Sequence, residues 1–349
     1  MFSAMHHAET RATDVAGATR FGKAGVGPEV GSAAGVLTGI HRTRGQMVSF
    51  ETVGDGGRRP DSVEGIRAVF DRMLTADGVA AGLAFEPRPD DVVISSFAKC
   101  GTTWLQQIVH SLRSNGHMEF DEISQVVPWI EPAADLGIDL DAEQTGHPRA
   151  FKSHLAWDPV PKGGRFIVSV RDPLDAALSV YRFFEGWFFE PGTLDVETFV
   201  RSWFLDSRNY YTHLGSWWPR RHQDDVLLLA YEHMKADLEG TVARVADFIG
   251  VRADDELLEL AARQSSFEAM TANKSKYSET LMRGLSETAG GLPPDSESSK
   301  VRTGQVGGHS VEFSDDLVAE FQTTWDETLG DLFGLADYGA LLKQLVGEA

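Results

Sequence analysis

The stretch ISSFAKCGTTWLQQIVHSL, residues 94–112, changes within a few residues from an apolar run to a helical pattern. The apolar residues of 91–97 predict a short buried strand, and the spacing of apolar residues over 102–116 predicts a helix. The first N–H groups of a helix have no partner within it, and the helix dipole adds positive charge at that end. The short connection therefore predicts an anion site, built from Lys99, Cys100, Gly101, Thr102 and Thr103.

The order of residues in this loop differs from that of nucleotide kinases. Their loop needs a glycine, four residues, and then Gly-Lys-Ser/Thr, whose hydroxyl binds Mg²⁺. Here Lys99 precedes Gly101, and Cys100 follows the lysine in place of a hydroxyl residue. The sequence therefore favours a phosphate that is bound without a metal. The lysine and the helix end beside Cys100 also predict an acidic thiol, although no redox role is expected.

Strand-like and helical segments alternate along the rest of the chain. Strands are predicted at 149–155, 164–172 and 225–234, and helices at 63–74, 173–184, 196–206, 210–218, 238–250, 254–264 and 314–334. Such alternation predicts an α/β fold with a mainly parallel sheet covered by helices on both faces. The segment 284–310 is rich in Gly, Ser and Pro and is predicted to be a long loop.

The N-terminal sixty residues differ in composition from the rest. They are rich in Gly, Ala and Thr and lack sustained periodicity, so we expect a disordered extension over 1–60 and a single domain over 61–349. Met47 is an alternative start of the protein.

The bulk composition excludes several classes of function. The formal net charge of -20 argues against a nucleic-acid partner, because phosphate backbones require a basic surface. The single cysteine excludes an intrachain disulfide and fits a reducing compartment. The sequence holds no apolar run of about 18 residues and no basic-then-apolar leader, so no membrane span is predicted and a cytoplasmic location is expected.

The loop sequence AKCGTTW, residues 98–104, resembles the 5′-phosphosulfate loop of the cytosolic-type sulfotransferases, whose usual form is Pro-Lys-Ser/Thr-Gly-Thr-Thr-Trp. Three further stretches resemble that family in order and spacing: PRAFKSHL (148–155), FIVSVRDPLDAALSVYRFF (166–184) and KVRTGQVGGH (300–309). The resemblance covers about 60–340 and suggests a bacterial member. It implies a P-loop-like α/β fold and the sulfonate donor 3′-phosphoadenosine 5′-phosphosulfate (PAPS).

The resemblance also implies roles for individual residues. It places the 5′-phosphate on the loop from Lys99 to Trp104, and the 3′-phosphate on Arg171, Ser179, Arg302, Thr303 and Gly304. Tyr231, Ser265 and Phe267 match positions on the adenine side. Three residues depart from the family pattern: Ala98 stands for proline, Cys100 for Ser/Thr, and His309 for tryptophan at the end of the late loop.

Sulfonyl transfer needs a cation at the leaving phosphate and a base at the acceptor hydroxyl. Lys99 is the candidate cation. The resemblance marks Lys152 and the catalytic His154, and residues two apart on a strand share one face. A histidine with a pKa near 6.5 suits a base at neutral pH. No metal is required, and the histidines form no spaced ligand cluster.

Each assignment has a structural alternative. Lys99 could be a solvated surface charge, His154 a structural histidine, and Ser179 a helix-surface serine, while Arg171 could pair with Asp172 or Asp175. The aromatic residues of 181–192 could be helix core. Their density at Phe184, Trp187, Phe188 and Phe189 also fits the wall of a pocket for a small apolar or aromatic acceptor that offers a hydroxyl or amine.

Two other functions remain open at this point. A P-loop small-molecule kinase would need Mg²⁺ ligands that the loop lacks. A non-catalytic nucleotide-binding protein would not need the base that His154 supplies. The expected partner is a small-molecule acceptor, and a homodimer is compatible with the sequence.

Overall fold

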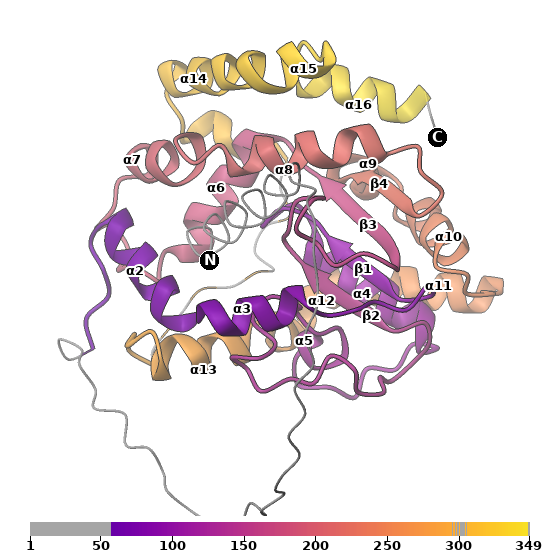
Figure 1. The fold of residues 1–349 in the computed structure, drawn as a ribbon. Coiled ribbons are helices and arrows are strands. Elements are labelled where there is room, and N and C mark those ends of the chain that lie inside the picture. Colours follow the sequence, from indigo (N-terminus) through magenta and orange to yellow (C-terminus); the bar gives the residue numbers. More distant parts are fainter. Residues whose placement is uncertain are drawn as a thin grey trace, which may run out of the picture.

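A four-stranded parallel sheet forms the centre of the computed structural model, which describes residues 57–294, 296, 298, 300, 304 and 306–347. The strands are β1 (Val92–Ser95), β2 (Ala150–Ser153), β3 (Arg165–Val170) and β4 (Val226–Ala230), in the order β2-β1-β3-β4. Val93 is in register with Phe151 on one side and Phe166 on the other. The predicted α/β fold with a parallel sheet is confirmed (Figure 1).

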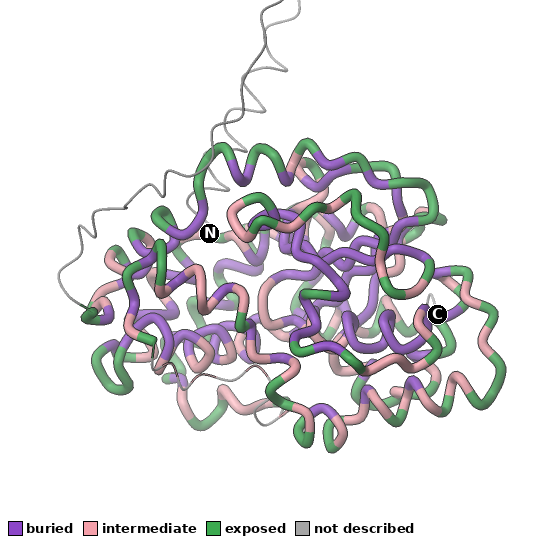
Figure 2. The backbone as a smooth tube through the Cα atoms, turned by 90° about the horizontal axis from the view of Figure 1, so that it is seen from below, coloured by how far each residue is buried: buried purple, intermediate pink, exposed green. Residues whose placement is uncertain are grey.

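Each strand is buried on both faces, because alternate side chains enter two separate apolar clusters. Val93, Phe151 and Phe166 belong to the larger cluster, which holds side chains of α2 (Val63–Met73), α6 (Pro173–Phe184) and α8 (Asn209–Trp217). Val92 and Ile94 belong to the second cluster, with α4 (Thr102–Arg113), α10 (Leu238–Phe248) and α11 (Asp255–Gln264). Helices therefore cover both faces, and Figure 2 shows the buried backbone running through the middle of the molecule.

The remaining helical elements surround this core. They are α3 (Ala76–Leu83), α5 (Ile123–Val126), α7 (Val196–Val200), α9 (Tyr231–Ala236), α12 (Phe267–Ala272), α13 (Thr280–Thr288), α14 (Asp315–Trp325), α15 (Asp331–Phe333) and α16 (Tyr338–Gly347). Two π-helical turns, η1 (Arg201–Leu205) and η5 (Asp326–Gly330), and the 3₁₀ turns η2 (Trp218–Arg220), η3 (Lys274–Tyr277) and η4 (Gly308–Val311) complete the set. No helix in the described ranges is both long and apolar enough to cross a bilayer.

The strands are shorter than predicted, and the strand predicted over 149–155 ends at Ser153, so His154 follows it. Two predicted segments also change type along their length. The strand predicted over 225–234 ends at Ala230, and α9 begins at Tyr231; in α9 only Met234 is buried, so the buried strand ends with its apolar run. The loop predicted over 284–310 begins inside α13, whose Ser286 accepts a hydrogen bond from Trp187 Nε1 at 2.9 Å. This contact joins positions 99 residues apart, so local composition gave no sign of it.

The strand order creates a crevice at the carboxyl ends of the strands. The chain leaves β1 into α4 on one face of the sheet, and it leaves β3 into α6 on the other face. Ligands of open α/β sheets bind outside the carboxyl ends of the strands at such a switch point. The predicted start of α6 at Pro173 is also observed, with the Asp172 side chain accepting from Leu174 N at 2.8 Å as the N-cap.

Candidate functional site

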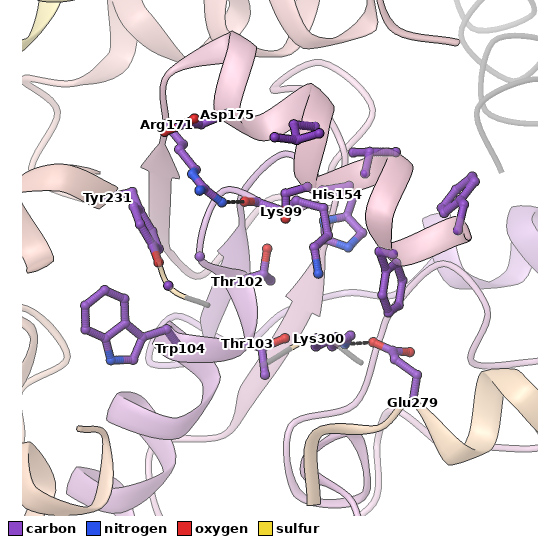
Figure 3. Close-up of a pocket in the computed structure, with 18 of the residues that line it drawn as sticks. Lys99, Thr102, Thr103, Trp104, His154, Arg171, Asp175, Tyr231, Glu279 and Lys300 are labelled. Carbon is purple, nitrogen blue, oxygen red and sulfur yellow. Dashed lines mark hydrogen bonds and ion pairs between the residues drawn. The ribbon is translucent and has the colours of Figure 1, made fainter. Parts of the chain in front are cut away.

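A cavity of about 610 Å³ lies at this crevice, and the predicted motifs meet around it (Figure 3). The β1–α4 connection, the end of β2, the end of β3 and one side of α6 all contribute to its wall. The predicted site residues that line it are Lys99, Gly101, Thr102, Thr103, Trp104, Lys152, His154, Arg171, Ser179, Tyr231, Ser265, Phe267 and Gly304. Segments far apart in the sequence are therefore brought to one cavity.

The connection before α4 has a conformation that glycine allows. Gly101 has φ 107°, and a Cβ there would lie 3.2 Å from Tyr231 Cδ2 and 3.3 Å from Ser169 Oγ. Ser169 Oγ also donates to the carbonyl of Cys100 at 2.7 Å, which ties the connection to β3. Thr102 Oγ1 is buried and has no hydrogen-bond partner among the described residues. The helix N-terminus and an unpaired hydroxyl together fit an oxyanion ligand.

The expectation of an acidic thiol at Cys100 is wrong. The side chain is fully buried, and burial raises the pKa of the thiol to about 12, although Arg171 opposes this shift. The thiol points away from solvent, with its sulfur 3.9 Å from the Ala98 carbonyl. The Cys100 side chain does not line the cavity, so the residue contributes its backbone to the loop.

The residue after β3 places a guanidinium beside the connection between β1 and α4. Arg171 Nη1 donates to the carbonyl of Lys99 at 3.2 Å, and its guanidinium carbon lies 4.5 Å from the centre of the Tyr231 ring. Ser179 lies further along α6 and is half-buried at the cavity. The Lys99 ammonium lies 4.2 Å from the centre of the Phe183 ring. Two cations thus flank the N-terminus of α4.

An aromatic group lies beside these cations. The rings of Trp104 and Tyr231 meet edge to face at 5.5 Å, and Trp104 Nε1 donates to the Ser265 carbonyl at 2.7 Å. The Ser265 hydroxyl is buried without a partner in the described part of the chain. Phe267 is 44% exposed, and a Cβ on Gly304 would lie 3.1 Å from its ring. This arrangement offers flat surfaces and an unused hydroxyl to a planar base.

His154 follows the end of β2 and has a fixed tautomer. Its Nδ1 lies 2.6 Å from the carbonyl of Ser96, and a carbonyl can only accept, so Nδ1 carries the proton and Nε2 carries the lone pair. Burial lowers the pKa of His154 well below 6.5, and the charge of Lys152 lowers it further. The imidazole is therefore neutral at pH 7, as a proton acceptor must be.

Lys152 lies on β2, two residues before His154, and is buried in a cluster of charges. Its Nζ is 2.7 Å from Glu279 Oε1 and 3.7 Å from the centre of the Trp129 ring. Burial lowers the pKa of Lys152 to about 8. Lys300 also contacts Glu279 Oε1, and burial, together with Lys152, holds the pKa of Lys300 well below 10.5. Two lysines therefore share one carboxylate at the cavity wall.

Sequence reasoning missed several residues of this cavity. Trp129 packs edge to face on His154 at 5.1 Å, and Glu131 Oε1 accepts from the His154 backbone N–H at 2.8 Å. Phe70 of α2 also lines the cavity, as do Met282 and Glu279 of the α13 region. None of them belongs to a local motif. The partner of Lys152, for example, lies 127 residues away along the chain.

The aromatic residues at the end of α6 and just after it lie partly in the cavity wall and partly in the apolar core. Phe184, Trp187 and Phe188 line the cavity. Phe189 does not, and its ring packs in the core at 5.5 Å from Tyr181. The prediction of a pocket wall is therefore wrong for Phe189, because the chain turns after Phe188 and directs that side chain inward.

The late loop is described only in part. Arg302 and Thr303 lie outside the described residues, as do residues 1–56 of the predicted N-terminal extension. The described part after Gly304 contacts α6: Asp175 accepts from His309 Nδ1 at 2.8 Å, and Arg182 pairs with Glu312 at 2.5 Å. No group of three or more His, Cys, Asp or Glu side chains in the described ranges could hold a metal ion.

Comparison with known proteins finds similarity to sulfotransferases. Residues 89–333 match the family model of the sulfotransferase domain. The chain is 27% identical to human sulfotransferase 1C2 over 255 residues, which are 69% of this chain and 83% of that protein. It is 31% identical to human sulfotransferase 2A1 over 207 residues, 56% of this chain and 71% of that protein. These relatives are mammalian, so a bacterial origin stays a prediction.

Solved structures confirm the fold. A mouse sulfotransferase complexed with PAP has a TM-score of 0.58 and 20% identity, covering 79% of this chain and 95% of that chain. Retinol dehydratase in a complex with retinol and PAP has a TM-score of 0.60 and 17% identity, covering 78% of this chain and 96% of that chain. At such identity the likeness concerns the fold.

Proposed function

The chain belongs to the sulfotransferase family, and from this premise we propose that it transfers the sulfonate group of PAPS to a hydroxyl or amine of a small apolar or aromatic acceptor. One observation carries the proposal: His154, with its proton fixed on Nδ1 by the Ser96 carbonyl, lines the same cavity as the N-terminus of α4. Simple nucleotide binding would not require a neutral imidazole in that place.

The nucleotide side of the cavity fits the proposed donor. The N–H groups at Gly101, Thr102 and Thr103, with the unpaired hydroxyl of Thr102, would hold the 5′-phosphate. Arg171 and Ser179 would hold the 3′-phosphate, joined by Arg302, Thr303 and Gly304 of the late loop. Trp104, Tyr231, Ser265 and Phe267 would enclose the adenine.

The donor supplies a sulfonate and a phosphate leaving group. His154 Nε2 would take the proton of the acceptor hydroxyl as the acceptor oxygen forms its bond to sulfur and the sulfur–phosphate oxygen bond breaks. Lys99, beside the N-terminus of α4, would stabilise the charge that develops on the leaving phosphate. Lys152, on strand β2 just before His154, would neutralise the sulfonate oxygens during transfer.

The acceptor side of the cavity is aromatic. Phe70, Phe184, Trp187 and Phe188 line the cavity together with His154 and Trp129. A wall of this composition favours a phenol, a steroid-like alcohol or a lipid alcohol over a strongly polar acceptor.

The test uses PAPS with a labelled sulfonate, a panel of phenols, apolar alcohols and amines, and EDTA in every sample. We expect labelled product from at least one apolar acceptor. Calorimetry should show far tighter binding of adenosine 3′,5′-bisphosphate in EDTA than of AMP or of ATP with Mg²⁺. Equal affinity for AMP and the bisphosphate would contradict the donor assignment, and preferred binding of ATP with Mg²⁺ would favour a kinase.

Three further expectations stay predictions: a cytoplasmic location, a homodimer, and a domain boundary near residue 61. Size-exclusion chromatography with light scattering checks the second, and limited proteolysis checks the third.

A further inference from the structure

A buried aspartate fastens the segment after Gly304 to α6. Asp175 accepts three hydrogen bonds from this segment: from Gly307 N at 2.7 Å, from His309 N at 3.4 Å and from His309 Nδ1 at 2.8 Å. The Asp175 side chain is 2% exposed and the His309 side chain 19%. A buried carboxylate thus takes all its described partners from one short segment.

The charges around this contact favour an ion pair. The hydrogen bond to Asp175 raises the pKa of His309 above 6.5, and the charge of Asp172 adds to this. Burial alone would raise the pKa of Asp175, but the hydrogen bonds from His309 and Gly307, with the charge of Arg171, hold it below its ordinary value. Both α6 carboxylates therefore favour a protonated His309.

This segment lies over the proposed nucleotide side of the cavity. Gly304 and Gly308 line the cavity, and the Gly304 carbonyl accepts from Lys235 Nζ at 2.7 Å. Asp175 is on α6 between Arg171 and Ser179, the two residues proposed for the 3′-phosphate. The fastening therefore sets where the backbone N–H groups of this segment lie relative to that phosphate.

We propose that the Asp175–His309 ion pair is a pH-sensitive clasp that holds residues 306–313 over the bound nucleotide, with His309 as a positioning residue. The inference rests on the proposed function for its ligand. The family motif that the late loop resembles has tryptophan where this chain has His309, and a tryptophan could not form this ion pair.

The sign of the pH dependence follows from the direction of the pKa shift. His309 has a raised pKa in the closed segment, so protonation stabilises closure, and this stabilisation is lost as the pH rises through the raised pKa. Neutral His309 still donates a hydrogen bond from Nδ1, but a charge-assisted bond is about twice as strong as a neutral one. The clasp therefore weakens at alkaline pH and does not vanish. A nearby phosphate favours the protonated form as well, so nucleotide binding takes up a proton.

A second contact of the same segment provides an internal reference. Arg182 pairs with Glu312, and this hydrogen bond raises the pKa of Arg182 above its ordinary value. Arg182 thus stays cationic at every pH near neutrality, and only the His309 contact loses its cation there.

The first test measures the affinity for adenosine 3′,5′-bisphosphate by calorimetry between about pH 6 and about pH 9 in the whole protein. His309→Gln keeps a donor but cannot titrate, so its curve reports the titration of the ligand phosphates, whose second pKa is near 6. We expect the wild type to lose about tenfold more affinity than His309→Gln across this range. The control is His147→Gln, because His147 also pairs with an aspartate, Asp90 at 3.2 Å, but lies outside the cavity. It should follow the wild type.

Parallel curves for the wild type and His309→Gln would overturn the clasp and leave the proposed function standing. If none of the proteins binds the bisphosphate at any pH, the proposed function fails instead.

Hydrogen exchange of the wild type without nucleotide tests the clasp independently of ligand binding. Protection factors of the Gly307 and His309 amides, corrected for intrinsic rates, should be several-fold higher at about pH 6 than at about pH 9. Equal protection would overturn the clasp without reference to any ligand or variant.

Discussion

Replacing His154 with alanine separates a catalytic role from a structural one. The imidazole is buried, its Nδ1 bonds to the Ser96 carbonyl, and burial and Lys152 hold its pKa well below 6.5. A positioned general base contributes about 10²–10⁴-fold to a rate, equivalent to ~2.7–5.4 kcal/mol of barrier. We expect His154→Ala to lose kcat by that factor with an apolar alcohol, while the affinity for adenosine 3′,5′-bisphosphate stays within a few-fold.

The chain offers a matched control in His213. This histidine is also buried, and its Nε2 bonds to the carbonyl of Ser95 at 3.1 Å, one residue before the partner of His154. It does not line the cavity. His213→Ala should lower the free energy of unfolding by ~1–3 kcal/mol, since it leaves a buried carbonyl unpaired, but should keep kcat within a few-fold.

The assay is initial-rate transfer of labelled sulfonate at saturating PAPS, with bisphosphate affinity by calorimetry on the same preparations. An aliphatic alcohol is the right acceptor, because it does not itself titrate between about pH 5 and about pH 8. The wild-type rate should stay level as the pH falls to 6.5, because the pKa of His154 lies well below that value. Equal turnover in His154→Ala and His213→Ala would refute the assignment of His154 as the base.

Two further predictions concern buried charge. Glu279→Gln removes the carboxylate 2.7 Å from Lys152 Nζ, so the pKa of Lys152 should fall below about 8. The fall of kcat at alkaline pH should then begin at a lower pH than in the wild type. An unchanged pH profile of kcat would show that the charge of Lys152 does not act in the transfer step. Burial lowers the pKa of His213 to about 4, and burial with Arg113 lowers that of His110 to about 3, so the unfolded state binds more protons below pH 6.5 and stability should fall there. Each histidine should lower the free energy of unfolding by roughly 2 kcal/mol at pH 5 relative to pH 7, and urea unfolding at both pH values checks this.

The elements near the anion site were the ones that the sequence predicted well. Strand β1 is a continuous buried run, and α4 begins after a glycine that needs a positive φ, so both are encoded within a few residues. The motif that holds Lys152 and His154 also reaches the cavity, although β2 ends at Ser153 and His154 lies just beyond the strand. Motifs of this kind are predictable because their geometry is local.

The rest of the site depends on contacts between distant positions. Glu279 meets Lys152 across 127 residues, and Asp175 meets His309 across 134. The thiol of Cys100 shows the same limit, because its neighbours in sequence predict an acidic group, whereas complete burial makes it a weak acid even though the charge of Arg171 opposes this. Local patterns identify which residues can do chemistry, but burial sets their pKa values.

The site also shows how an acidic protein can bind a highly charged anion. The formal charge of -20 is spread over the whole chain, and surface charges more than about 8 Å apart are largely screened at physiological ionic strength. Cations and carboxylates both line the cavity: Lys99, Lys152, Arg171, Lys235 and Lys300, with Asp175, Glu268, Glu279 and Glu312. Screening is weak in this partly desolvated space, so Lys99 and Arg171, which flank the N-terminus of α4, act on a bound anion more strongly than distant surface carboxylates do. Glu279 contacts both Lys152 and Lys300, so it offsets part of the repulsion between these two buried lysines.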